Sequence, residues 1–101
     1  MSGKERQLAA LNAEIARERA QSLSRGSLRL RATLESLRRF DSGAAEGKPR
    51  SQLVTEASEA CLAYLVQREI MGFGAQDAEA IRREYGVPRD VWNAMGALPR
   101  T

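Results

Sequence analysis

Apolar residues recur at helical spacing along the first forty residues of the chain. When the chain is turned by 100° per residue, one face of residues 4–40 collects Leu8, Leu11, Ile15, Leu23, Leu30, Leu34, Leu37 and Phe40. Leu28 alone falls on the opposite face, among charged and polar residues. This period predicts one long amphipathic helix over about residues 4–40.

The segment Ser22–Leu28 is the weak point of this predicted helix. Gly26 lowers the stability of a helix by about 1 kcal/mol relative to alanine, which allows a kink near 24–27 in a continuous helix or, as the alternative, a break there. Ser24 or Ser27 would then cap the break. However, Gly26 falls on the apolar face, where a glycine also marks a close crossing of two helices. We therefore favour a continuous helix.

The rest of the chain predicts three further helices after a flexible linker at about 41–50, which is rich in glycine and small residues. The second helix is expected over about 50–71 and ends at Gly72. Its apolar side chains lie nearly all round it, so we expect a buried helix: Leu53, Ala57, Ala60, Leu62, Tyr64, Val66, Ile70 and Met71. Two short helices, about 77–85 and 88–97, meet at Gly86 and Pro88.

The predicted fold class is therefore all-α, with residues 1–101 forming a single helical domain. A first helix of this length would be roughly 54 Å long, which exceeds the diameter of a compact domain of this size. The remaining residues are too few to cover its whole apolar face. We expect a second copy to cover it in a dimer, with an interface drawn from Leu8, Leu11, Ile15, Leu23, Gly26 and Leu30.

The composition excludes several kinds of chemistry. The chain has no histidine and a single cysteine, Cys61, so the usual histidine-based triads and thiolate zinc sites are ruled out. Cys61 lies mid-helix among apolar residues, which predicts an inert, buried thiol. We expect no catalytic residue, cofactor, metal or small-molecule ligand, and therefore no enzyme. An enzyme built from Arg68 and glutamates is a weaker alternative.

Membrane insertion and export are not predicted either. The longest apolar run, Ala60–Val66, is far too short to span a bilayer. The first residues, MSGKERQLAALNAE, contain no apolar core of a signal peptide. Together with the lone cysteine, these features lead us to expect a cytoplasmic protein.

Positive charge is concentrated in the first helix. Residues 1–40 carry nine basic residues against four glutamates, although the whole chain has a net charge of only +3. The stretch Ile81–Trp92 also resembles the turn of a helix-turn-helix. DNA binding through Arg89 and Asn93, or through Arg25 and Arg29 of the basic helix, is therefore the alternative to self-association. It is disfavoured because residues 72–101 carry equal numbers of basic and acidic groups.

Arg68 is the remaining residue of note. It lies on a helix that we expect to be buried, and a buried arginine needs a carboxylate partner. Asp77 and Glu84 are the candidates nearby in the sequence. A structural ion pair is favoured over a catalytic role.

Several segments resemble an uncharacterised family of small bacterial proteins, known only as a domain of unknown function. These segments are RERAQSLSRGSLRLRATLESLRRFD, LVQREIMGF, REYGVPRDV and MGA, of which QRE and YGVPR are the most specific. The resemblance implies a helical protein of this length, and it supplies no activity or catalytic residue. From the apolar face that the rest of the chain cannot cover, we expect a non-enzymatic, helical interaction protein that associates with itself.

Overall fold

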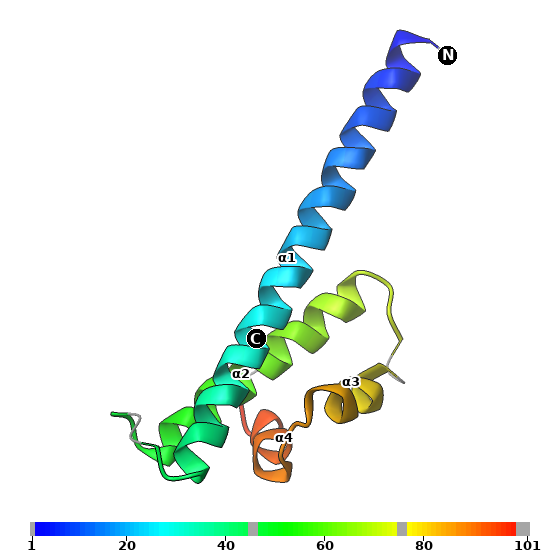
Figure 1. The fold of residues 1–101 in the computed structure, drawn as a ribbon. Helices are drawn as coiled ribbons and strands as arrows, with labels where there is room; N and C mark the ends of the chain where they lie inside the picture. The colour runs from blue at the N-terminus through cyan, green and yellow to red at the C-terminus, as the bar shows by residue number, and fades with distance from the viewer. Residues whose placement is uncertain (1, 45–46, 75–76, 99–101) are drawn as a thin grey trace.

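The computed structural model describes residues 2–44, 47–74 and 77–98. Within these residues the protein is all-helical (Figure 1), as predicted. Its helices are α1 (Gly3–Asp41), α2 (Arg50–Ile70), α3 (Asp77–Tyr85) and α4 (Arg89–Met95). The molecule is elongated, with extents of 62 × 26 × 26 Å, because α1 projects far beyond the other helices.

Helix α1 is continuous through Gly26, so the alternative of a break near 24–27 is wrong. Its start is fixed locally by a capping box: the Ser2 hydroxyl accepts from the Glu5 N–H, and the Glu5 carboxylate accepts from the Ser2 N–H. Arg38 and Arg39 lie in the last turn, where positive charge interacts favourably with the helix dipole.

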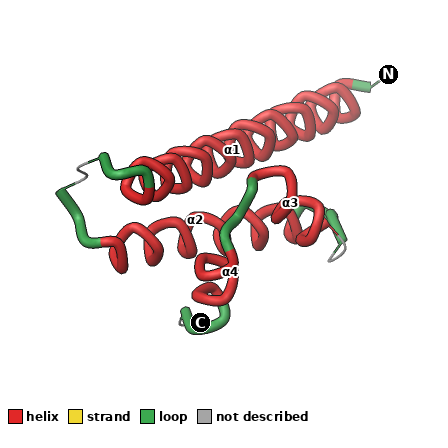
Figure 2. The backbone as a smooth tube through the Cα atoms, turned by 60° about the horizontal axis from the view of Figure 1, so that its bottom comes forward, coloured by secondary structure: helices red, strands yellow, loops and turns green. Residues whose placement is uncertain are grey.

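The core forms where the C-terminal half of α1 packs on α2, with α4 also against α2 (Figure 2). Leu30 and Leu37 of α1 and Val91 of α4 are almost completely buried there. The remaining buried core residues are Leu34, Leu53, Ala57, Ala60, Cys61, Tyr64, Ile81, Val87 and Met95. Burial of this apolar surface is the main source of the stability of the fold.

Two glycines end helices and thereby orient the elements that follow. Gly72 and Gly86 have φ values of 96° and 63°, which a residue with a Cβ rarely adopts. The N–H of the residue after each glycine donates a hydrogen bond to a carbonyl of the helix that has just ended. Phe73 donates to the Arg68 carbonyl, and Val87 donates to the Arg82 carbonyl. Both ends are therefore Schellman motifs, as the positions of the glycines predicted.

The prediction that α2 is buried all round is wrong. The faces of α2 turned toward α1 and α4 are buried, and even the polar Ser58 is enclosed there, where its hydroxyl donates to the Val54 and Val91 carbonyls. By contrast, Val66 is 44% exposed and Ile70 is 76% exposed. The C-terminal half of α2 diverges from α1 (Figure 1), so no element of the described chain covers that side.

Gly26 lies where α1 packs tightly against the side chains of α2. A Cβ at this position would lie 3.0 Å from Gln67 Oε1 and 3.2 Å from Tyr64 Cδ1. A larger side chain would therefore force the two helices apart.

We expect Gly26→Leu to lower the free energy of unfolding by about 1–3 kcal/mol, in spite of the gain in helix propensity. Urea denaturation monitored by circular dichroism would measure this. Ser24→Leu is the matched control, because it places the same side chain at an exposed position two residues away, about 200° around the helix. Equal effects of the two substitutions would contradict the close crossing.

Candidate functional site

The most unusual feature of the structure is the N-terminal half of α1, residues 3–21, which we call the projecting segment. Every residue of this segment is exposed. Its apolar face nevertheless carries Leu8, Leu11 and Ile15, which are 59%, 51% and 38% exposed. Exposed aliphatic side chains that repeat on one helical face are typical of an interaction surface.

The same apolar face continues into the core farther along α1. Leu23 is partly buried against the core, Gly26 touches α2, and Leu30 is completely buried. These residues are already used inside one chain. Of the interface residues predicted from the sequence, only Leu8, Leu11 and Ile15 are therefore exposed and available to a partner.

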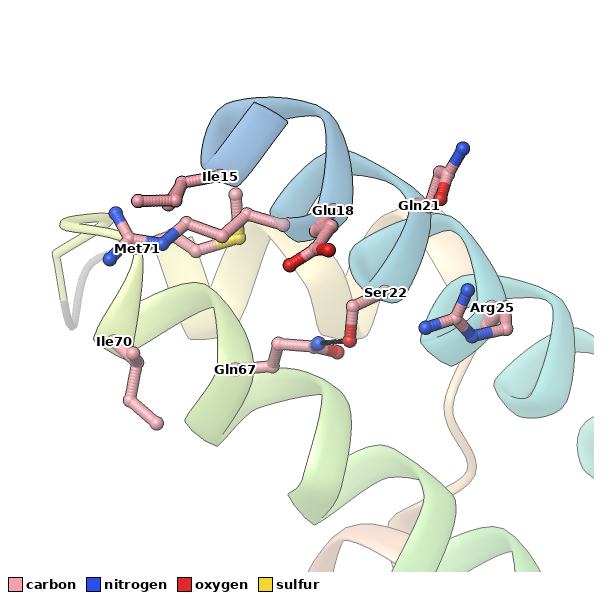
Figure 3. A pocket seen from close by; sticks show the side chains of 9 residues that line it. Ile15, Glu18, Gln21, Ser22, Arg25, Gln67, Ile70 and Met71 are labelled. Carbon is pink, nitrogen blue, oxygen red and sulfur yellow. Dashed lines mark hydrogen bonds between the residues drawn. The ribbon is translucent and has the colours of Figure 1, made fainter. Parts of the chain in front are cut away.

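A cleft of about 600 Å³ opens where the projecting segment diverges from the end of α2. Figure 3 shows Ile15, Glu18 and Ser22 on the α1 side of this cleft, facing Gln67 and Met71. A hydrogen bond from the Gln67 amide to the Ser22 hydroxyl closes its inner end. The lining combines three apolar side chains, Ile15, Ile70 and Met71, with six polar or charged ones: Glu18, Arg19, Gln21, Ser22, Arg25 and Gln67.

The sequence pattern did not reveal the contribution of α2 to this cleft. Ile70 lines the cleft and is largely exposed, and Met71 lies beside it (Figure 3). Periodicity assigned Ile70 to a buried face, because the divergence of α1 and α2 cannot be read from either helix alone. Two exposed apolar surfaces, on α1 and on α2, consequently meet at one place.

Arg68 links the end of α2 to the start of α3. Its guanidinium lies 4.2 Å from the centre of the Phe73 ring and 5.8 Å from that of Tyr64. One of its terminal nitrogens lies 3.7 Å from Asp77 Oδ2, one of the two carboxylates that the sequence suggested as partners. The Arg68 side chain remains 19% exposed. Its surroundings are those of a structural arginine.

A tyrosine pair joins α1, α2 and α3 next to the core. The Tyr85 hydroxyl lies 2.5 Å from the Ser27 hydroxyl and donates to the Tyr64 hydroxyl at 3.4 Å. Burial raises the pKa of Tyr64, and its pairing with Tyr85, which ionises first, raises it further. Burial also opposes ionisation of Tyr85, but hydrogen bonds with Ser27 and Tyr64 and the nearby Arg31 lower its pKa overall. The rings meet edge to face and fix α3 against the two long helices.

Cys61 is completely buried in the core, as predicted. Burial raises the pKa of its thiol to about 11, so the reactive thiolate is scarce at neutral pH. We expect the native protein to react with a disulfide reagent at pH 8 at least about 100-fold more slowly than the urea-unfolded chain. Rapid labelling of the folded chain would contradict the burial of the Cys61 thiol.

Because the pKa of Cys61 is raised in the folded protein, the free energy of unfolding should fall as the pH rises from about 9 to 11.

Charged side chains form ion pairs between helices at the end of the molecule where α1 is followed by α2. Arg50, at the start of α2, forms ion pairs with Asp41 at 2.8 Å and with Asp90 at 2.7 Å. The hydrogen bond from Arg50 lowers the pKa of Asp41. Lys48 likewise lowers the pKa of Glu56, to which it is bound at 2.8 Å. These pairs are solvent-accessible, so they order the surface more than they stabilise the fold.

The residues of the DNA-binding alternative lie on α4, in the helix corner with α3, and on α1. Arg89 and Asn93 are exposed on α4, and Arg25 and Arg29 are exposed on α1. Arg82, at the position where a helix-turn-helix usually has a small residue, lies 5.4 Å over the Trp92 ring. The exposure of the four residues is compatible with nucleic-acid contact, but it does not test the DNA-binding hypothesis, which stays a prediction.

Two absences hold for residues 2–44, 47–74 and 77–98. Within these ranges no helix is both long enough and apolar enough to cross a membrane. The same residues hold no group of three or more side chains arranged to bind a metal ion.

These observations define a class of protein: a small all-helical protein whose longest helix projects from its core and exposes an apolar face beside a cleft. The model of the family of unknown function DUF6665 matches residues 2–101, and the chain belongs to this family. Comparisons with curated proteins and with solved structures give no match. The resemblance to a domain of unknown function is thereby confirmed.

Proposed function

We propose that this protein is a non-enzymatic interaction protein that self-associates through the projecting segment of α1. The observation that carries the proposal is the exposure of Leu8, Leu11 and Ile15 on one face of an otherwise charged helix. Burying a leucine side chain contributes roughly 1.5–3 kcal/mol, and a dimer buries each of these residues twice. A twofold dimer is the simplest arrangement that achieves this.

The length of the projecting segment supports the same proposal. Nineteen residues extend about 28 Å at 1.5 Å per residue. A helix of this length that packs on nothing is only marginally stable in water, even with a good cap. A partner helix along its apolar face would supply the missing tertiary stabilisation.

A non-enzymatic role is supported because the two residues most able to take part in catalysis, Cys61 and Arg68, already have structural contacts. Cys61 is enclosed in the core, and Arg68 stacks on Phe73 and pairs with Asp77. We also propose a cytoplasmic location, because a buried, free cysteine is typical of a reducing compartment.

Light scattering coupled to size-exclusion chromatography, together with sedimentation velocity, tests the proposal. We expect a mass of about twice 11.1 kDa at tens of micromolar, and a shift toward 11.1 kDa on dilution. Far-ultraviolet circular dichroism over the same range should show a loss of helix on dilution, as the projecting segment frays. A monomer at all of these concentrations would refute self-association.

A further inference from the structure

We infer that two copies pair with their projecting segments parallel and in register, so that the two helical cores lie at the same end of the dimer. The parallel orientation rests on the proposed self-association and adds to it the charged residues that specify how the second copy is placed. It follows from the spacing of the apolar residues of the projecting segment and from the charges on either side of them.

The apolar residues of the projecting segment have the spacing of a coiled coil. Leu8, Leu11 and Ile15 are separated by three and then four residues, which places Leu8 and Ile15 at a positions and Leu11 at a d position of a heptad repeat. In parallel coiled coils, a β-branched residue at a with leucine at d, as in Ile15 and Leu11, favours two strands. The d positions on either side are Lys4 and Glu18. The segment thus contains three apolar layers bounded by charged residues.

Only the parallel orientation uses all three apolar layers. In a parallel pair in register, Leu8, Leu11 and Ile15 each face the same residue of the second copy. In an antiparallel pair a positions face d positions, so Leu11 and Ile15 face each other. Leu8 is then left opposite the Glu18 carboxylate. A shift of the antiparallel register by one heptad pairs Leu8 with Leu11 instead, but it leaves Ile15 opposite Lys4. Parallel pairing therefore buries more apolar surface against apolar surface.

The charges that flank the apolar face favour the same orientation. Glu14 lies at a g position and Arg19 at the following e position, and these two positions meet across a parallel pair. A twofold dimer contains this attraction twice. Both side chains are exposed, and neither forms an ion pair within the described part of its own chain. Antiparallel pairing would bring Glu5 to Arg19 twice as well, but it would also bring the two Glu14 carboxylates together near the axis, which adds a repulsion.

The pairing ends where α2 begins to cover α1. From Ser22 onward the same face of α1 contacts α2, and Ser22 accepts a hydrogen bond from the Gln67 amide. The second copy must therefore turn away after Ile15. Like charges on the two Glu18 side chains, which follow at the next d position, favour divergence at this point. The dimer is then a short parallel stalk from whose base the two cores diverge.

Reversal of the two flanking charges tests the orientation in solution. We expect Glu14→Arg and Arg19→Glu each to weaken the homodimer by about tenfold at low salt, because each replaces two attractions by two repulsions. An equimolar mixture of the two variants should restore association, since opposite charges then face each other in a parallel heterodimer. In an antiparallel pair, Glu14→Arg would still place like charges at the axis and leave the dissociation constant unchanged. Arg6→Glu, on the opposite face of α1, is the matched control and should have no effect.

Disulfide formation provides an independent measurement. In a Cys61→Ala background, Lys4→Cys places one thiol at the d position before Leu8, where a parallel pair brings the two copies together. We expect a disulfide-linked homodimer in a glutathione redox buffer. In an antiparallel pair the two copies of this residue would lie about 27 Å apart along the helix. Arg6→Cys, on the opposite face, controls for random collision, and equal linkage of the two variants would overturn the parallel orientation.

Failure of the orientation and failure of self-association give different results. If the unmodified chain is monomeric at tens of micromolar, self-association itself fails, and the parallel orientation fails with it. If the chain is dimeric, but Glu14→Arg leaves the dissociation constant unchanged and Lys4→Cys forms no disulfide, self-association stands and only the parallel orientation fails.

Discussion

The triple variant Leu8→Ser, Leu11→Ser, Ile15→Ser is expected to be monomeric under conditions where the unmodified protein is a dimer. Its three substitutions remove the exposed apolar face of the projecting segment. With each side chain buried twice in a dimer, we expect the dissociation constant to rise by at least about 100-fold, which corresponds to about 2.7 kcal/mol. Sedimentation equilibrium over a range of concentrations would measure the change.

Leu28→Ser is the control for this variant. Leu28 is 64% exposed, and it lies on the opposite face of the same helix. Its substitution removes the same kind of side chain without touching the proposed interface, so the dimer should persist. If Leu28→Ser dissociates the dimer as strongly as the triple variant does, the interface has been assigned to the wrong face.

The second large effect concerns stability. We expect Leu30→Ala to lower the free energy of unfolding by about 2–5 kcal/mol, because Leu30 is completely buried where α1 meets the core and alanine would leave a cavity. This is a large fraction of the stability of a small domain. Urea denaturation at a fixed protein concentration would measure the loss, since association also stabilises the folded state.

Leu28→Ala serves as the matched control, two residues away on the exposed face. Its effect should stay within about 0.5 kcal/mol, as is usual for surface positions. A loss below about 1 kcal/mol for Leu30→Ala would mean that α1 contributes little to the core. The packing of α1 on α2 would then be incorrect.

The helices themselves could be predicted from the sequence because their signals are local. The period of the leucines specified α1, and the glycines at positions 72 and 86 specified where α2 and α3 end. A left-handed turn that satisfies the last carbonyls of a helix depends on only a few neighbouring residues. The partner of Arg68 could also be named from the sequence, since Asp77 is one of the two carboxylates that lie nearby in the chain.

The course of α1 through Gly26 could not be decided in the same way. Helix propensity favours a break at this position, whereas a close crossing favours a glycine within a continuous helix. The sequence contains no information on the distance between α1 and α2. The approach of Gln67 and Tyr64 to within 3.0 and 3.2 Å of a Cβ position explains why a glycine is found there.

The exposed face of α2 was predicted wrongly for a related reason. Apolar residues nearly all round a helix indicate burial only if neighbours surround the helix, and here α1 diverges from α2 before Ile70 is covered. The cleft lined by Ile15, Ile70 and Met71 arises from this divergence. A site formed between two elements depends on the angle at which they cross, and periodicity does not report that angle.

By itself, the sequence therefore determined the helical class, the ends of the helices and the apolar face of α1, because each depends on residues within a few turns of one another. The tertiary structure decided how this face is divided. From Leu23 onward it packs inside the chain, while Leu8, Leu11 and Ile15 remain exposed. The division falls where α2 leaves α1, since apolar surface stays in solvent wherever no second element lies close enough to bury it.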